Sequence, residues 1–182
     1  HPFRGGRMST DTPVSFMCNS LSSNMIPQVG DQAPMFEALL CNVETFRPHS
    51  LRESFGTRGA VLVFGGFVFS AIALNWWARY EQYGWHEFDD VPVYGVYRDG
   101  PYAVNEFLRR RSVPFGFFSD VDGDVASAYG LLVERHGMAG TQTAMRAIFV
   151  IDSNGSVVHT WNTDEWIYPV PTRQLQQHIE SL

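Results

Sequence analysis

Apolar residues are densest in residues 60–78, and a glycine pair divides this run in two. Residues 60–64 are apolar and partly β-branched, and Gly65-Gly66 after them would interrupt a helix. We therefore predict a buried strand, a tight turn, and a helix that starts near Ser70 and ends at about Gly84, where glycine is a stop signal. The alternative is a membrane-spanning helix, because the run is almost uncharged and nearly long enough to cross a bilayer. The glycine pair argues against it.

The rest of the chain alternates between strand and helix patterns. Asn154-Gly155 is a strong hairpin turn signal, and Pro101 suits the first turn of a helix. Strands alternating with helices, followed by a hairpin and a helix, predict an α/β thioredoxin-like fold, with a central mixed sheet flanked by helices. The predicted elements are a hairpin in 36–46, a helical turn in 50–55, strands at 92–97 and 115–118, helices at 101–111 and 125–130, a hairpin of 147–151 with 156–161, and a closing helix at 172–182.

Order is predicted to begin near residue 29. Residues 1–28 are polar, contain proline, and carry scattered hydrophobic residues without a period, so we expect a flexible N-terminal tail followed by one domain over residues 29–182. The chain does not open with the charged, apolar and small-residue regions of a signal peptide. A cytoplasmic protein is therefore the expectation.

Charge and cysteine content exclude several function classes. The net charge is −6, lysine is absent, and the one basic run, residues 109–111, is too short for a nucleic-acid stripe. Two cysteines, Cys18 and Cys41, cannot build a disulfide framework. The six histidines lack the paired spacing of a zinc motif, and Gly65-Gly66 lacks the spaced glycines and lysine of a phosphate loop. We expect neither a metal nor a cofactor, and neither a nucleic-acid partner nor a membrane span.

Three separated motifs carry a family resemblance. Residues 29–36 read Val-Gly-Asp-Gln-Ala-Pro-Met-Phe, residues 115–120 read Phe-Gly-Phe-Phe-Ser-Asp before Ala-Ser-Ala-Tyr-Gly at 126–130, and residues 146–155 read Arg-Ala-Ile-Phe-Val-Ile-Asp-Ser-Asn-Gly. Their order and spacing over residues 29–161 resemble the peroxiredoxins, the AhpC/TSA or redoxin-domain family of thiol peroxidases. The resemblance implies the same thioredoxin-like fold.

The catalytic segment of that family reads Pro-x-x-x-Thr/Ser-x-x-Cys. By resemblance, Gly66 stands for the proline, Ser70 keeps the hydroxyl, and Ala73 occupies the place of the cysteine. In the family the thiolate attacks the O–O bond of the peroxide, and alanine offers no lone pair for this step. The resemblance also assigns Ser70 and Arg146 to holding the peroxide. We therefore expect a pseudoenzyme without thiol peroxidase activity, in which the domain serves binding or assembly.

Two interpretations of the remaining pocket stay open. Ser70, the amides near Ala73 and the guanidinium of Arg146 form an anion-binding set in principle, which would make the protein a carrier of a small ligand. In the structural interpretation, Ser70 caps the helix and Arg146 ties strands together through a carboxylate.

Two further alternatives rest on other residues. A thiol-dependent antioxidant oxidoreductase could use Cys41, although buried cysteines are usually inert and nothing near it predicts a lowered pKa. Trp76, Trp77 and Tyr80 crowd one helix, and such residues concentrate at protein interfaces. They predict a homodimer or larger homo-oligomer, or a surface for another protein partner.

Overall fold

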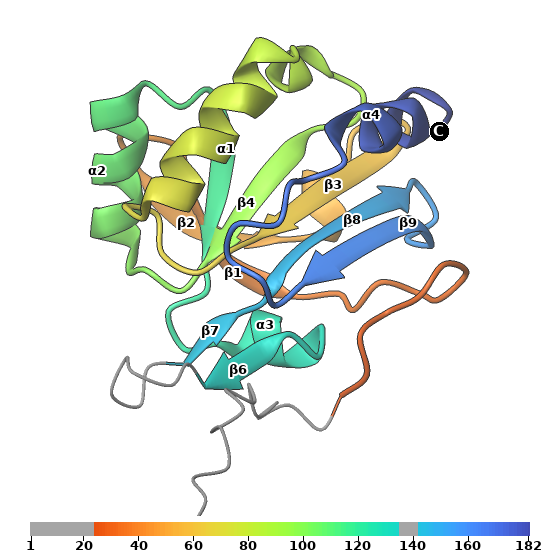
Figure 1. The fold of residues 1–182 in the computed structure, drawn as a ribbon, viewed down its shortest axis with the longest axis horizontal. Helices are drawn as coiled ribbons and strands as arrows, with labels where there is room; N and C mark the ends of the chain where they lie inside the picture. The colour runs from red at the N-terminus through yellow and green to blue at the C-terminus, as the bar shows by residue number, and fades with distance from the viewer. Residues whose placement is uncertain (1–23, 135–141) are drawn as a thin grey trace, which may run out of the picture.

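The computed structural model describes residues 24–134 and 142–182, and these build one mixed sheet covered on both faces (Figure 1). The seven-stranded sheet has the order β2-β1-β5-β4-β3-β8-β9, and β6 pairs with β7 in a small separate sheet. The strands are β1 (Glu37–Cys41), β2 (Phe46–Ser50), β3 (Gly59–Phe64), β4 (Val93–Tyr97), β5 (Gly116–Ser119), β6 (Leu132–Glu134), β7 (Gln142–Ala144), β8 (Arg146–Asp152) and β9 (Val157–Thr163).

Four α-helices are described, together with two short 3₁₀ turns. The helices are α1 (Ala71–Gln82), α2 (Pro101–Arg111), α3 (Asp124–Ala128) and α4 (Thr172–Glu180), and the 3₁₀ turns are η1 (Arg52–Ser54) and η2 (Trp85–Glu87). In Figure 1, α1, α2 and α4 lie on one side of the large sheet, and α3 lies on the other with β6 and β7. Each helix in the described ranges is too short or too polar to cross a bilayer.

The apolar run of β3 is the centre of the fold. All six of its residues are buried, as expected for a strand with parallel and antiparallel neighbours and a covered sheet on both faces. Val61 and Val63 join the core under α1, α2 and α4, whereas Leu62 and Phe64 join the core around α3. This alternation follows from the two-residue period of a strand, and each fully buried side chain of this size contributes roughly 1.5–3 kcal/mol.

The thioredoxin-like α/β prediction is confirmed, with differences in detail. The first hairpin is longer than predicted, because β1 pairs with β2 from Glu37 opposite Ser50 to Cys41 opposite Phe46. The three-residue strands β6 and β7 were not predicted, since so short a run gives no readable period.

Residues 24–28, which precede the predicted boundary at residue 29, contact the rest of the described chain. The side-chain amide of Asn24 donates to the carbonyl of Ser127 at 2.9 Å, and Pro27 is buried. The boundary between tail and domain stays a prediction. Most of the predicted tail, including Cys18, lies outside the described residues.

Candidate functional site

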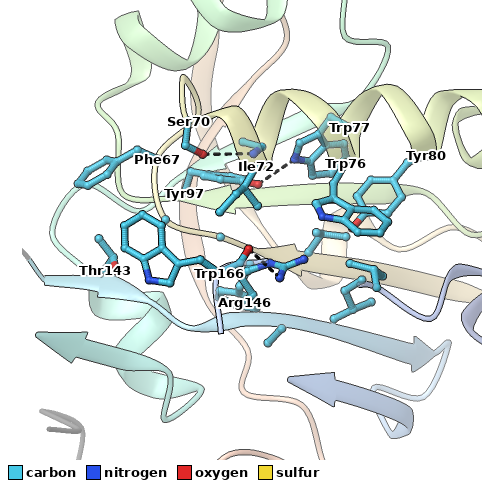
Figure 2. A pocket seen from close by; sticks show the side chains of 18 of the residues that line it. Phe67, Ser70, Ile72, Trp76, Trp77, Tyr80, Tyr97, Thr143, Arg146 and Trp166 are labelled. Atoms are coloured by element: carbon cyan, nitrogen blue, oxygen red, sulfur yellow. Dashed lines mark hydrogen bonds between the residues drawn. The ribbon is translucent and has the colours of Figure 1, made fainter. Parts of the chain in front are cut away.

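A pocket lies between the first turns of α1 and the strands β3 and β8 (Figure 2). Its volume is about 140 Å³. It contains all three residues of the predicted pocket, so the fold brings Ser70, Ala73 and Arg146 together from distant parts of the sequence. Its lining residues are Val63, Phe64, Gly65, Gly66, Phe67, Ser70, Ile72, Ala73, Trp76, Trp77, Tyr80, Tyr97, Thr143, Arg146, Ala147, Ile148, Trp161, Trp166 and Val170.

Ser70 is the N-cap of α1. Its backbone is extended, with φ −69° and ψ 149°, and its hydroxyl accepts the backbone N–H of Ala73 at 3.2 Å. Serine is among the best residues for this position, because its short side chain reaches one of the N–H groups that lack an intrahelical acceptor. The predicted capping role is therefore present, and it directs the start of α1 toward the pocket.

Two small residues shape the pocket beside this cap. Ala73 is buried, and it contributes a methyl group that can neither donate nor accept a proton. A Cβ placed on Gly66 would meet no atom within 4 Å, so the space in front of this residue is open. Both residues line the pocket, and larger side chains at either position would reduce its volume.

Arg146 begins β8 and is only 8% exposed. Its Nη1 donates to the carbonyls of Glu165, Trp166 and Tyr168 at 3.1, 3.1 and 2.7 Å. Its Nη2 is buried without a hydrogen-bond partner, and none of the ion pairs in the described ranges includes this guanidinium. The predicted tie through a carboxylate is wrong, since Arg146 instead holds the segment between β9 and α4 through backbone carbonyls.

Aromatic rings surround the guanidinium of Arg146. Its Cζ lies 5.8 Å from the ring centre of Trp76 and 5.5 Å from that of Trp161, within the range of a cation–π contact. In Figure 2 the guanidinium lies between the indoles of Trp76 and Trp166, across the pocket from Ser70. Burial lowers the pKa of Arg146, yet an arginine stays charged in proteins. The pocket therefore holds a positive charge among apolar walls.

Tyr97 is a pocket residue that the sequence did not reveal. Its hydroxyl accepts the indole N–H of Trp77 at 2.9 Å, and burial raises its pKa to about 12, so the phenol keeps its proton at neutral pH. A Cβ on Gly65 would lie 2.6 Å from the Tyr97 ring. Glycine at 65 thus lets the ring closely approach the backbone directly after β3. No local pattern around Tyr97 could have signalled this role, because Gly65 and Trp77 lie on other elements.

Comparison with known proteins places the chain in a family. The model of the AhpC/TSA family matches residues 29–160, which is most of the chain. The chain belongs to the AhpC/TSA family. This confirms the resemblance that the three sequence motifs indicated.

Individual relatives are distant. The Coxiella burnetii protein named "Putative peroxiredoxin bcp" is 29% identical over 72 residues, which cover 39% of this chain and about half of that protein, 48%. A thiol peroxidase from Chromobacterium violaceum superposes with a TM-score of 0.71 at 15% identity, covering 90% of this chain and 91% of that one. AhpC from Mycobacterium tuberculosis superposes with a TM-score of 0.69 at 18% identity, and the match covers 86% of this chain and 93% of that one. At these identities the structures support the fold alone.

The cysteine of this AhpC/TSA chain that the structure describes lies away from the pocket. Cys41 is fully buried in the core shared by α1 and α2 and does not line the pocket. Burial raises the pKa of its thiol to about 12, and its Sγ lies 3.9 Å from the carbonyls of Leu39 and Pro101. A thiol that is neither exposed nor ionised is a poor nucleophile. Its environment therefore disfavours a catalytic role.

The three interface candidates do not share one surface. Trp77 and Tyr80 are each 2% exposed and pack inside the core, where the Tyr80 ring stacks on Trp85 with 4.6 Å between the ring centres. Neither is available to a partner, which corrects the prediction made from their residue types. Trp76 is partly exposed and lines the pocket. Association into a homo-oligomer stays a prediction without these two side chains.

Proposed function

We propose that this AhpC/TSA chain does not reduce peroxides by the thiol route, and that it binds a small organic anion in the pocket at the start of α1. The observation that carries the proposal is the buried guanidinium of Arg146, whose Nη2 has no partner and which contacts no carboxylate in the described ranges.

An uncompensated charge favours an anionic ligand. Taking a cation out of water costs several kcal/mol unless a counter-charge and hydrogen bonds replace the water. The three carbonyls satisfy Nη1 of Arg146 but carry no net charge, and Nη2 remains unpaired. A carboxylate in the pocket would pair with Nη2 through a charge-assisted hydrogen bond and neutralise the guanidinium.

The N-terminus of α1, which faces Arg146 across the pocket, also favours a negatively charged ligand. The first N–H groups of a helix have no intrahelical acceptor, and the Ser70 hydroxyl satisfies only that of Ala73. The N–H groups of Ala71 and Ile72 lie in the same first turn, where the helix dipole also favours negative charge. Because α1 is twelve residues long, this dipole is well developed.

In this proposal the chain lacks the cysteine thiolate that peroxide reduction by the family mechanism requires. By resemblance to the family's catalytic segment, Ala73 stands at the cysteine position, and no cysteine is among the described residues that line the pocket. Peroxide reduction by the family mechanism forms a sulfenic acid on that sulfur. We accordingly expect no consumption of hydrogen peroxide by the purified chain with dithiothreitol as donor. Turnover that Cys41→Ala abolishes would overturn this part and identify a thiol oxidoreductase that uses Cys41.

Anion binding is tested by thermal stabilisation. The full chain is melted at constant ionic strength with chloride, acetate, benzoate and phosphate, because a ligand that binds only the folded state raises the Tm. We expect at least one organic anion to raise it, and Arg146→Gln to remove that increase relative to its own ligand-free Tm. Arg173→Gln is the matched control, since Arg173 is exposed on α4. An unchanged Tm across the panel would contradict the proposal.

A further inference from the structure

The chemistry of the pocket walls narrows the class of anion. Resting on the proposed function, we propose that the ligand is a small aromatic monocarboxylate, a single planar ring that carries one carboxylate. The carboxylate pairs with Nη2 of Arg146, and the ring occupies the aromatic space toward Gly66 and Ala73.

The size of the pocket limits the ligand to about one ring. Its volume is about 140 Å³, and an engineered apolar cavity of about 150 Å³ in another protein holds benzene. The open space in front of Gly66 and the short side chain of Ala73 supply part of this volume. A two-ring compound would have to displace a wall of the pocket.

Aromatic side chains form much of the wall and favour a planar ring. Trp76 and Trp166 lie on either side of the guanidinium in Figure 2. Trp76 and Trp161 are also within cation–π range of it. Phe64 and Phe67 extend the apolar lining. Aromatic rings attract one another in stacked and edge-to-face arrangements beyond what area burial alone provides. A planar ring therefore gains contacts here that an acetate-sized anion cannot make.

The polar groups of the pocket select one negative charge. Among the lining residues that the structure describes, Arg146 is the single cation and none is an aspartate or glutamate. A cationic amine would meet the guanidinium without a counter-charge, and a dianion would keep one charge unpaired in an apolar site. The Tyr97 hydroxyl, which keeps its proton, is a second donor for a carboxylate oxygen. A monocarboxylate matches this set.

Calorimetric titration with four probes separates the two proposals. The probes are benzoate, its uncharged amide benzamide, the non-planar cyclohexanecarboxylate, and acetate, all at one ionic strength. We expect benzoate to bind at least tenfold more tightly than each of the others. Acetate or cyclohexanecarboxylate binding as tightly as benzoate would overturn the aromatic inference and leave the anion proposal standing. Absence of binding by every probe would overturn both, and benzamide binding as tightly as benzoate would overturn the role of the charge.

Two variants locate the binding. Gly66→Leu places a side chain in the open space, and Gly100→Leu is its control, because a Cβ on Gly100 also meets no atom within 4 Å and Gly100 does not line the pocket. Trp166→Ala removes a wall that is 48% exposed while keeping the carbonyl bonded to Arg146. We expect each pocket variant to weaken benzoate binding at least tenfold with a cooperative unfolding transition retained. Unchanged benzoate affinity in both would overturn the inference.

Discussion

The hydroxyl of Ser70 accepts the backbone N–H of Ala73 at 3.2 Å, and this bond ends the loop after β3 and begins α1 at the edge of the pocket. The Ser70 hydroxyl therefore accepts a hydrogen bond from the first turn of its own helix. The other polar side chains that line the pocket include Arg146, Tyr97 and Thr143.

Ser70→Ala tests this cap. Loss of an N-cap hydroxyl leaves the Ala73 amide without its acceptor, and we expect the free energy of unfolding to fall by about 1 kcal/mol. Urea denaturation followed by circular dichroism measures the change. Ser153→Ala, at an exposed position in the β8–β9 turn, is the control and should change stability little. Equal stability of the two variants would show that the cap contributes nothing.

Ala73→Cys tests whether the start of α1 activates a thiol. A cysteine in the first turn of a helix commonly has a pKa of roughly 3.5–7.5, because the helix N-terminus stabilises the thiolate. Arg146 adds a positive charge to the same pocket. We expect the variant, with Cys18 replaced by serine, to react with iodoacetamide at pH 7 at least tenfold faster than the Cys18→Ser chain. Cys41, whose pKa burial raises to about 12, provides the slow reference in both proteins. A rate that rises only above pH 9 would contradict activation.

Gly65→Ala tests the close approach of Tyr97. The added methyl would lie 2.6 Å from the ring and hydroxyl of Tyr97, which is buried and held by Trp77. Overpacking a core in this way costs roughly 1–3 kcal/mol, and we expect that loss in chemical denaturation. Gly66→Ala is a closely matched control, because its methyl meets no atom within 4 Å. Equal stability of the two variants would show that Tyr97 moves aside without cost.

The buried carboxyl of Asp120 predicts a pH dependence. Burial raises its pKa to about 6, although the carboxylate accepts the N–H groups of Val125 and Ala126. Since the folded pKa lies above the unfolded value of 3.8, the folded state binds the proton more tightly. This contribution to stability is complete below pH 3.8 and is lost as the pH rises through 6.

Asp120→Asn removes that titration. Between pH 4 and 7 the free energy of unfolding of the unmodified chain should fall relative to the variant by roughly 2.5 kcal/mol, most of what a pKa difference of about two units implies. Urea denaturation at half-unit pH steps measures the difference. Asp89→Asn, at an exposed aspartate, should reproduce the profile of the unmodified chain. Parallel profiles for the chain and Asp120→Asn would contradict the raised pKa.

The sequence by itself determined most of the elements and their order. The apolar run of β3, Pro101 at the start of α2, and Asn154-Gly155 between β8 and β9 each carry a local signal, because strand period, proline geometry and turn chemistry depend on neighbouring residues. The family motifs also placed Ser70, Ala73 and Arg146 at one site, and the pocket contains all three.

Only the tertiary structure decided what these residues contact. Arg146 bonds to carbonyls 19 to 22 positions later, in a segment without a period, so no pattern distinguished them from a carboxylate partner. Trp77 and Tyr80 have residue types common at interfaces, yet the docking of α1 on the sheet buries them. Tyr97 reaches the pocket because Gly65, directly after the neighbouring strand β3, leaves room for its ring. Contacts between distant residues depend on how elements pack, and packing is not encoded in any one segment.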